Sequence, residues 1–382
     1  MKDGEAATLS QCKRLSLSSI ELSPLIAKWI DQFDTQDQAV AIELLLRLRL
    51  ITTDHFWRWV KSAMEFIGPE ISGLFAVRKI SKGTNYWNHA GVPLERPAKS
   101  LGSEDYVSSQ ISQFARERSD QWIDHPDLKK MRSKGIKHLV FIDDSIGSGK
   151  RVCDFTRNIF NHGTIKSWWS LGVIDAYIIT LFRSSESTVD VLDSFPGSDH
   201  HRRKYPRRTK IHFISDWIYE NNVYWPRWGP EASRFIDLCQ KYGKIHGLHK
   251  DFIAGYRFSF SPYIFEHGAP NNIPGILFCQ SPTWKPLFPN RTIPAELISA
   301  FLDGGIGKFK QGLGLAVRGP LTGQILALLT YIKSGIKGKA SLAMRLSCHS
   351  SHVASLCDRA IQAGLLTTGI RLTSVPYLKS LE

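Results

Sequence analysis

A run of apolar residues ends in two adjacent carboxylates in the stretch HLVFIDDSIGSGKR, residues 138–151. The carboxylates, Asp143 and Asp144, stand directly before a short turn that contains two glycines and leads to two basic residues. The nearly all-apolar run at 139–143 is typical of a strand inside a parallel sheet, where both faces of the strand are buried. Ligands of such sheets bind beyond the carboxyl ends of the strands. The stretch therefore predicts a ligand site at residues 143–151.

Strand patterns and helix patterns alternate through the middle of the chain. We expect strands at 73–80, 139–143, 174–182 and 210–215, and helices at 104–117, 126–134, 150–162 and 229–242. A helical pattern also covers 23–67, and the segment 262–292, rich in Pro, Asn, Gly and aromatic residues, indicates an irregular but packed region. Strands that alternate with helices predict an α/β domain with a mainly parallel sheet.

Composition limits the class of protein. The 382 residues allow two or three domains, and a hydrophobic fraction of 42% excludes a globally disordered chain. The net charge of +14 favours polyanionic partners such as nucleic acid or nucleotides. The 6 cysteines form no CxxC pair, which argues against a zinc site or a disulfide scaffold. We find no signal peptide and no apolar run long enough to span a bilayer, so we expect a cytoplasmic protein without membrane contact.

The turn after the two carboxylates has the chemistry of a phosphate site. It offers backbone N–H groups, the Ser148 hydroxyl and the N-terminus of the next helix, all of which suit a phosphate. Asp143 and Asp144 cannot bind the phosphate themselves, but they can accept hydrogen bonds from vicinal hydroxyls or hold Mg²⁺ near a diphosphate. A phosphorylated sugar satisfies both halves of this site.

Three other interpretations of the stretch stay open. GSGKR resembles the end of a P-loop, but Asp144 stands where the required glycine would be and Arg151 replaces the Ser or Thr. LVFIDD resembles a Walker B strand, although the sequence contains no GxxxxGK[ST] to accompany it. The third interpretation is a solvated strand end whose acids only cap the following helix.

The stretch resembles the 5-phosphoribosyl 1-diphosphate (PRPP) motif of type I phosphoribosyltransferases. That motif has an apolar strand, two acids, three mostly small or apolar residues, Ser or Thr, Gly, any residue and then often Thr. The resemblance implies that Asp143 and Asp144 contact the ribose hydroxyls. It implies that the 5-phosphate is wrapped by Ser145, Ile146, Gly147, Ser148, Gly149, Lys150 and Arg151. Two positions depart from the motif: Gly147, where a larger residue is usual, and Arg151, which replaces Thr but can pair with phosphate.

The same resemblance implies a diphosphate loop after an earlier strand. Arg78 and Lys79, which follow GLFAV, are the candidates, and an ordinary basic strand end is the alternative. The implied chemistry is loss of diphosphate from C1 through an oxocarbenium-like state, with Mg²⁺ at Asp143 and Asp144 and cations stabilising the leaving group.

A broader resemblance covers roughly residues 25–290. The helical lead-in, HGAPNN at 267–272 and WKPLFP at 284–289 resemble a divergent phosphoribosyltransferase-like group of bacterial conflict systems, which includes effectors of retrons. It implies that His267, Asn271 and Asn272 close over the ligand. The alternative, favoured for Asn272, is a turn whose Asn side chains bond their own backbone. The basic segment HRRKYPRRTK, 201–210, is either a nucleic-acid contact or a solvated loop.

The C-terminal sixty residues resemble a winged helix-turn-helix. LTGQILALLTYIKSG, KASLAMRLSC and SSHVASLCDRAIQAGLL read as three helices, and TTGIRLTSVPYL reads as a two-stranded wing. The core of this module is expected from Leu342, Ala343, Leu346, Val353, Leu356 and Ile361. The nucleic-acid or partner face is expected at Ser351, His352, Ser355, Arg359 and Arg371.

These features predict a helical N-terminal region at 1–68, a phosphoribosyltransferase-like α/β domain at 69–292, a linker at 293–320 and a winged helix-turn-helix at 321–382. Two functions follow. One is a toxic effector of antiphage defence that binds a ribose phosphate or nucleotide and, by resemblance, a reverse transcriptase with its RNA–DNA product. The other is a PRPP-sensing, DNA-binding transcriptional regulator without catalysis. Bacterial purine repressors combine the same two modules, although with the winged helix first.

Overall fold

The structure is a computed structural model. It describes residues 12–81, 83–94, 103–197 and 210–302, together with short parts of 325–371. The chain divides into two compact units, of which the first comprises Met1–Arg14 and Leu25–Ile298 and the second Leu15–Pro24 and Ser299–Glu382. The N-terminal helices from Leu25 onward therefore belong to the same unit as the sheet. The domain boundaries at 68, 292 and 320 stay predictions.

A parallel sheet forms the centre of the first unit. Its strands are β2 (Ser72–Ala76), β3 (Trp122–Asp124), β4 (His138–Ile146), β5 (Asp175–Ser184), β6 (Ile211–Ile214) and β7 (Trp217–Tyr219). The order is β3-β2-β4-β5-β6, and β7 pairs with the end of β5. All of these pairs are parallel, so the predicted α/β class with a mainly parallel sheet is confirmed. The central strand is β4, the apolar strand that ends in the two acids.

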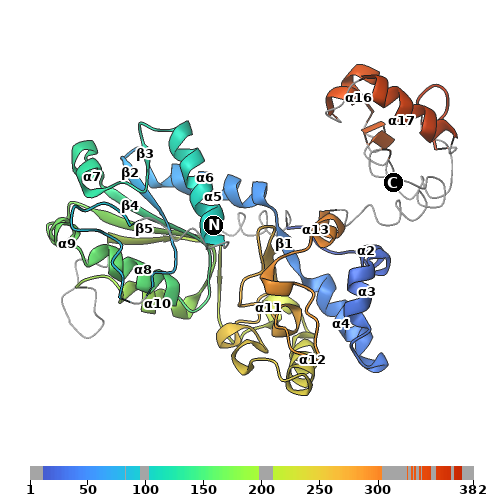
Figure 1. Ribbon diagram of the computed structural model, residues 1–382, viewed down its shortest axis with the longest axis horizontal. Coiled ribbons are helices and arrows are strands. Elements are labelled where there is room, and N and C mark those ends of the chain that lie inside the picture. Colours follow the sequence, from blue (N-terminus) through green and yellow to red (C-terminus); the bar gives the residue numbers. More distant parts are fainter. Residues whose placement is uncertain are drawn as a thin grey trace. The chain divides into compact units, whose positions relative to one another are not determined.

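Helices cover both faces of this sheet (Figure 1). One face packs against α5 (Thr53–Ile67) and α6 (Ser103–Glu117). The other packs against α7 (Leu128–Lys134), α8 (Lys150–Phe160), α9 (Gly163–Ser170) and α10 (Ser185–Leu192). Because side chains alternate along a strand, Leu139 and Phe141 of β4 join the α8 side while Val140 and Ile142 join the α5 side. Burial on both faces explains why the strand is apolar throughout.

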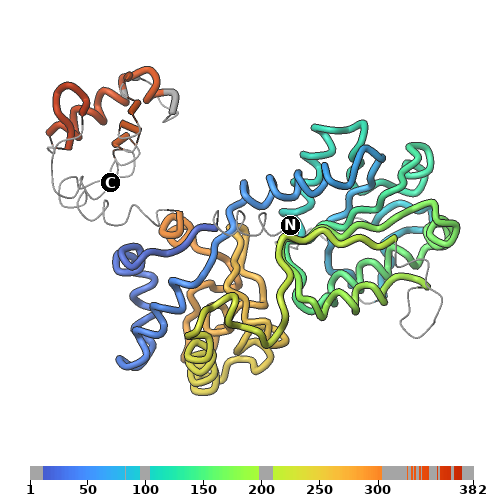
Figure 2. Tube along the Cα trace, turned by 180° about the vertical axis from the view of Figure 1, so that it is seen from behind, coloured from blue at the N-terminus to red at the C-terminus, as the bar shows by residue number. Residues whose placement is uncertain are grey.

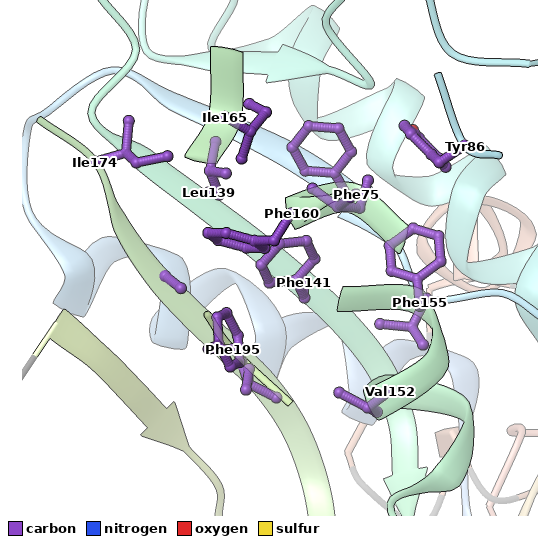
Figure 3. Packing of buried hydrophobic residues seen from close by; sticks show 14 of the residues in the cluster. Phe75, Tyr86, Leu139, Phe141, Val152, Phe155, Phe160, Ile165, Ile174 and Phe195 are labelled. Carbon is purple, nitrogen blue, oxygen red and sulfur yellow. The ribbon is translucent and has the colours of Figure 1, made fainter. Parts of the chain in front are cut away.

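Aromatic rings fill the layer between β4 and α8 (Figure 3). Phe141 stacks on Phe75 of β2 with ring centroids 5.8 Å apart and meets Phe155 of α8 edge-on at 6.1 Å. Phe160, at the end of α8, packs edge-on against Phe195 at 4.9 Å. Edge-on and offset ring pairs add to the stabilisation that burial alone gives. This layer holds the start of α8 in a fixed position beside the end of β4.

A second group of elements packs around a two-stranded parallel sheet of β1 (Arg49–Ile51) and β8 (Tyr263–Phe265). The helices are α3 (Pro24–Ile30), α4 (Thr35–Arg47), α11 (Trp225–Trp228) and α12 (Ala232–Ile245), and α13 (Ala295–Leu302) spans the division between the two units. Short 3-10 helices lie at Lys250–Phe252, Tyr256–Phe258, Gly275–Leu277 and Pro289–Arg291. Helices α4 and α12 run side by side in both views (Figures 1 and 2), and Lys241 joins them by ion pairs to Asp34 and Asp37.

The strand β1 interrupts the helical pattern expected over 23–67. Its apolar residues pair with β8, more than two hundred positions later, and such a distant partner leaves no local signal. The segment 262–292, expected to be irregular, contains β8 and two 3-10 helices and is largely buried, so its packed character is confirmed.

The described parts of the second unit include α2 (Leu17–Leu22), α16 (Lys339–Arg345) and α17 (Ser350–Gln362). A small apolar cluster contains Leu342, Ala343, Val353 and Leu356, with Ile361 packed against it, as expected. Leu346 and the expected wing beyond Arg371 lie outside the described residues. The winged fold therefore stays a prediction. Among the described helices of the whole chain, none is both long enough and apolar enough to cross a bilayer.

Candidate functional site

The carboxylate of Asp143 is buried at the end of β4 and pairs with a basic residue of α8. Its side chain is 4% exposed. Arg151, in the first turn of α8, donates from Nε to Asp143 Oδ2 at 3.2 Å and from Nη2 to Asp143 Oδ1. A forked pair of this kind fixes the planes of both groups. Asp143 is thus held by the helix that covers its own face of the sheet.

The carboxylate of Asp144 meets a different set of donors. Its Oδ1 accepts from the Ser145 backbone N–H at 2.6 Å and from Arg151 Nη2 at 3.3 Å. Its Oδ2 lies 3.2 Å from His267 Nε2. Arg151 therefore touches both acids, whereas His267 touches Asp144 alone among the described contacts.

The imidazole of His267 is held by aromatic rings, with its side chain 8% exposed. It stacks on Tyr106 of α6 with centroids 4.6 Å apart and on Phe265 of β8 at 5.1 Å. The β1–β8 pairing brings this residue to the site, because Ile51 lies opposite Phe265, two residues before His267. The histidine thus reaches the end of β4 through a strand pairing formed elsewhere in the unit.

Burial and neighbouring charges separate the pKa values of the two acids. Burial raises the pKa of Asp143 above its usual range, and the adjacent Asp144 charge adds to this rise against the opposing effect of Arg151. Burial also acts to raise the pKa of Asp144, but the hydrogen bond from His267 and the Arg151 charge outweigh it and lower that pKa. Two close carboxylates of unequal proton affinity are typical of functional sites.

The turn between β4 and α8 requires a glycine at position 149. Gly149 is the N-cap residue of α8 and has a φ of 73°. A Cβ there would lie 3.2 Å from Ser187 Cβ and 3.2 Å from Val191 Cγ2, both on α10. The backbone can therefore turn closely under α10 and present the first turn of α8, whose N–H groups have no acceptors within the helix.

A cavity of about 240 Å³ opens at this turn. Three segments line it: Asp143–Val152, His267–Asn272 and Asn290–Thr292. Three cations, Lys150, Arg151 and Arg291, line it together with the two acids. The arrangement offers carboxylate acceptors and phosphate-attracting charge in one space. The structure thus brings together the predicted residues of 143–151, His267 and Asn271.

The two asparagines of HGAPNN have different surroundings. Asn271 lines the cavity, and its backbone carbonyl accepts from the Tyr256 N–H at 3.0 Å. Asn272 also lines the cavity but is 3% exposed, and its Nδ2 lies 3.3 Å from the Tyr219 hydroxyl. The Asn272 amide thus bonds another element rather than its own backbone.

Arg78 and Lys79 lie outside the lining of this cavity. Arg78 donates to the Leu94 carbonyl at 2.8 Å and lies over the Tyr86 ring. Lys79 lines an adjoining cavity of about 910 Å³, which shares Lys150 and Arg151 with the first. Their part in diphosphate binding stays a prediction.

Sequence reasoning missed the segment Asn290–Thr292. Asn290 and Arg291 have positive φ values of 52° and 61°, and both line the cavity. The sequence offers one weak indication of this segment, an Arg that directly follows Phe-Pro-Asn. The pair Asp124 and His125, at the end of β3, was also missed: His125 Nε2 accepts from the Ala76 N–H at 3.0 Å and so orients the end of β2.

The two acids do not fit a directly bound Mg²⁺ in this arrangement. Carboxylate oxygens are the ligands Mg²⁺ prefers, but donors from Arg151, Ser145 and His267 occupy those of Asp143 and Asp144. Within the ranges that the structure describes, no group of three or more His, Cys, Asp or Glu side chains could hold a metal ion. A Mg²⁺ requirement stays a prediction from the sequence.

The residues predicted to bind nucleic acid lie on the second unit. Ser351, Ser355 and Arg359 are exposed and four positions apart on α17, so they share one face of that helix, and Arg371 is exposed nearby in sequence. His352 belongs to α17, but its side chain lies outside the described residues. Of the basic segment 201–210 only Lys210 is described, and it bonds the Gly172 carbonyl and Asp175.

Comparison with known families gives a match over most of the first unit. The model of the PRTase-CE family matches residues 26–290. The chain belongs to the PRTase-CE family. The match includes the acids of β4, the turn into α8 and the His267 segment, so this member is a phosphoribosyltransferase-like protein. No curated protein and no solved structure matches the chain.

Proposed function

We propose that this PRTase-CE protein binds a ribose phosphate, such as PRPP, in the cavity between the β4–α8 turn and the His267 segment. One observation carries the proposal: two buried carboxylates and three cations line a single cavity at the carboxyl end of the central parallel strand. Neither a P-loop nor a simple helix cap accounts for that combination. A capping acid would be exposed at a helix start, whereas Asp143 and Asp144 are buried and paired.

The proposed ligand is oriented by its two ends. The ribose hydroxyls donate to Asp143 and Asp144, and the 5-phosphate lies at the turn before α8, where Lys150 and Arg291 attract it. The dipole of α8, which has no acidic residue in its first turn, favours the phosphate charge further.

The proposed chemistry is transfer of a phosphoribosyl group or cleavage of a ribosyl bond. The bond between C1 and the leaving oxygen breaks, and its electron pair departs with the leaving group. C1 forms a new bond to the nucleophilic atom of the acceptor in a transfer, or to the oxygen of a water molecule in a cleavage, and that atom then loses its proton. Cations beside the departing oxygen stabilise the developing negative charge. For PRPP the leaving group is diphosphate, and the adjoining cavity with Lys79 and Arg157 is the space for it.

Calorimetry tests the binding step. Wild-type protein should bind PRPP and ribose 5-phosphate, and the double variant Asp143→Asn/Asp144→Asn should bind them roughly tenfold or more weakly, because the hydroxyls lose the charged acceptor Asp144 and the carboxyl oxygens of Asp143. Ribose and inorganic phosphate serve as controls, since each offers only half of the ligand. Equal affinity of wild type and double variant would remove the site assignment.

We further propose that the ligand site serves a toxic effector of bacterial antiphage defence, associated with a retron and docked through its C-terminal module to nucleic acid or a reverse transcriptase. The support is the resemblance of the whole 25–290 segment together with the separate module. Induced expression should slow growth, and the double Asp variant at equal abundance should be harmless. Toxicity that survives the double variant would place the activity elsewhere. A protein inert under every trigger that still binds PRPP would favour the regulator.

A further inference from the structure

The guanidinium of Arg151 occupies the position where a divalent cation would neutralise the two acids. It contacts Oδ1 and Oδ2 of Asp143 and Oδ1 of Asp144. The fourth oxygen, Asp144 Oδ2, lies 3.2 Å from His267 Nε2. Every carboxylate oxygen of the pair therefore already has a protein partner.

Acceptor capacity nevertheless remains for hydroxyl groups. A carboxylate oxygen has two lone pairs. Asp143 Oδ2 accepts from Arg151 Nε, and Asp144 Oδ2 lies within hydrogen-bond distance of His267 Nε2. Two vicinal hydroxyls can use these lone pairs while Arg151 stays in place. A Mg²⁺ ion, in contrast, would have to approach the same oxygens to about 2.1 Å beside a second full positive charge.

Arg151 is also held well enough to act as a permanent charge. It stands in the first turn of α8, next to Val152 of the buried apolar cluster, and its side chain is 36% exposed. Guanidinium groups do not lose their proton in proteins, and the Asp143 and Asp144 charges raise the pKa of Arg151 further against the effect of burial. The other cations of the cavity are differently placed: Lys150 pairs with the half-exposed Asp154 at 2.9 Å, and Arg291 belongs to the separate lining segment Asn290–Thr292.

We propose that Arg151 is the resident counter-cation of the two acids, and that the site binds its ribose phosphate without a divalent metal ion. This inference rests on the proposed function for the identity of the ligand. It accounts for the Arg that replaces the Thr often found at this position of the PRPP motif. It assigns Arg151 to the acids and leaves Lys150 and Arg291 for the phosphate.

The first test measures metal binding to the ligand-free full-length protein by Mn²⁺ electron paramagnetic resonance. Wild-type protein should show no Mn²⁺ site that depends on Asp143. Arg151→Thr should gain such a site, and Arg151→Thr/Asp143→Asn should lose it again. Arg151→Lys, which keeps a cation, should resemble wild type. Circular dichroism establishes that each variant is folded.

The second test measures ribose 5-phosphate affinity by calorimetry with Mg²⁺ or with excess EDTA. This probe carries no diphosphate that would itself collect the metal. Wild-type affinity should change by less than about twofold between the two conditions, whereas Arg151→Thr should bind roughly tenfold more weakly in EDTA than in Mg²⁺.

The inference would be overturned if wild-type protein had a Mn²⁺ site and Asp143→Asn lacked it, and this comparison needs no variant of Arg151. A wild-type affinity for ribose 5-phosphate that falls roughly tenfold in EDTA would also overturn it. Failure of the wild type to bind ribose 5-phosphate under either condition would count against the proposed function instead, and the Mn²⁺ measurement would still decide the role of Arg151.

Discussion

At the scale of single residues, the two acids of β4 are neighbours in sequence but differ in their surroundings. Asp143 faces α8 and Arg151, whereas Asp144 faces His267 and the aromatic rings of α6 and β8. The pKa of Asp143 is raised to about 8, and that of Asp144 is lowered. Ionisation of Asp143 should therefore destabilise the folded protein, whereas ionisation of Asp144 should stabilise it.

Replacing each acid by Asn tests this difference. Because folding raises the pKa of Asp143, its contribution to the free energy of unfolding is fully present below the unfolded pKa of about 3.9. This contribution is lost as pH rises through the folded pKa of about 8. A lowered pKa means that Asp144 stabilises above about 3.9 and ceases to do so as pH falls through its folded pKa. Urea unfolding near pH 8 should show Asp144→Asn about 1–3 kcal/mol less stable than wild type, and Asp143→Asn close to wild type or more stable.

The same two variants near pH 5 provide the control. At this pH any gain in the free energy of unfolding of Asp143→Asn over wild type should shrink, because Asp143 is protonated in the folded protein. A loss at pH 8 as large for Asp143→Asn as for Asp144→Asn would show that Arg151, not burial, dominates the free energy of Asp143.

At the scale of elements, the part of the site that is local in sequence could be predicted and the rest could not. Fourteen consecutive residues predict β4 from its apolar run, the carboxyl end of β4 from the two acids, and the start of α8 from the glycine turn. The contact between His267 and Asp144 depends on β1 pairing with β8, and no local pattern specifies that partner. Arg291 enters through a 3-10 turn with positive φ at two non-glycine residues, which propensity does not indicate. Arg151 was expected on a phosphate, whereas the structure pairs it with both acids.

The glycine turn itself gives an element-scale prediction. Gly149→Ala should lower the free energy of unfolding by about 1–3 kcal/mol, because φ is positive and the new Cβ would press on Ser187 and Val191. Gly147→Ala is the matched control, since its Cβ would meet only Asn272 Cβ at 3.8 Å, an ordinary contact. Thermal unfolding of the two variants compares them. Equal destabilisation would mean that the turn is not held against α10 as described.

At the scale of the whole molecule, the two compact units carry different predicted tasks. The first contains the cavity, the acids and the residues matched by the PRTase-CE model. The second contains the apolar cluster around α16 and α17 and the exposed face with Ser351, Ser355 and Arg359. A unit with its own core can be removed without unfolding its neighbour.

Deleting residues 321–382 tests that separation. PRPP affinity of the truncated protein should stay within about twofold of full length, because every residue that lines the cavity lies in the first unit. Binding to nucleic acid should be lost, and in the full-length protein it should weaken steeply as salt rises, because phosphate contacts release counterions. Gel shifts at several salt concentrations measure the second effect. Nucleic-acid binding that survives the deletion would assign it to the first unit.

Crystals soaked with ribose 5-phosphate test the central claim most directly. Electron density should place the phosphate against the backbone of Ser145–Gly149 at the start of α8. The ribose hydroxyls should lie within hydrogen-bond distance of Asp143 and Asp144, with Arg151 still in contact with both acids. A phosphate seated instead in the adjoining cavity beside Lys79 and Arg157, or hydroxyls turned away from the two acids, would contradict the account.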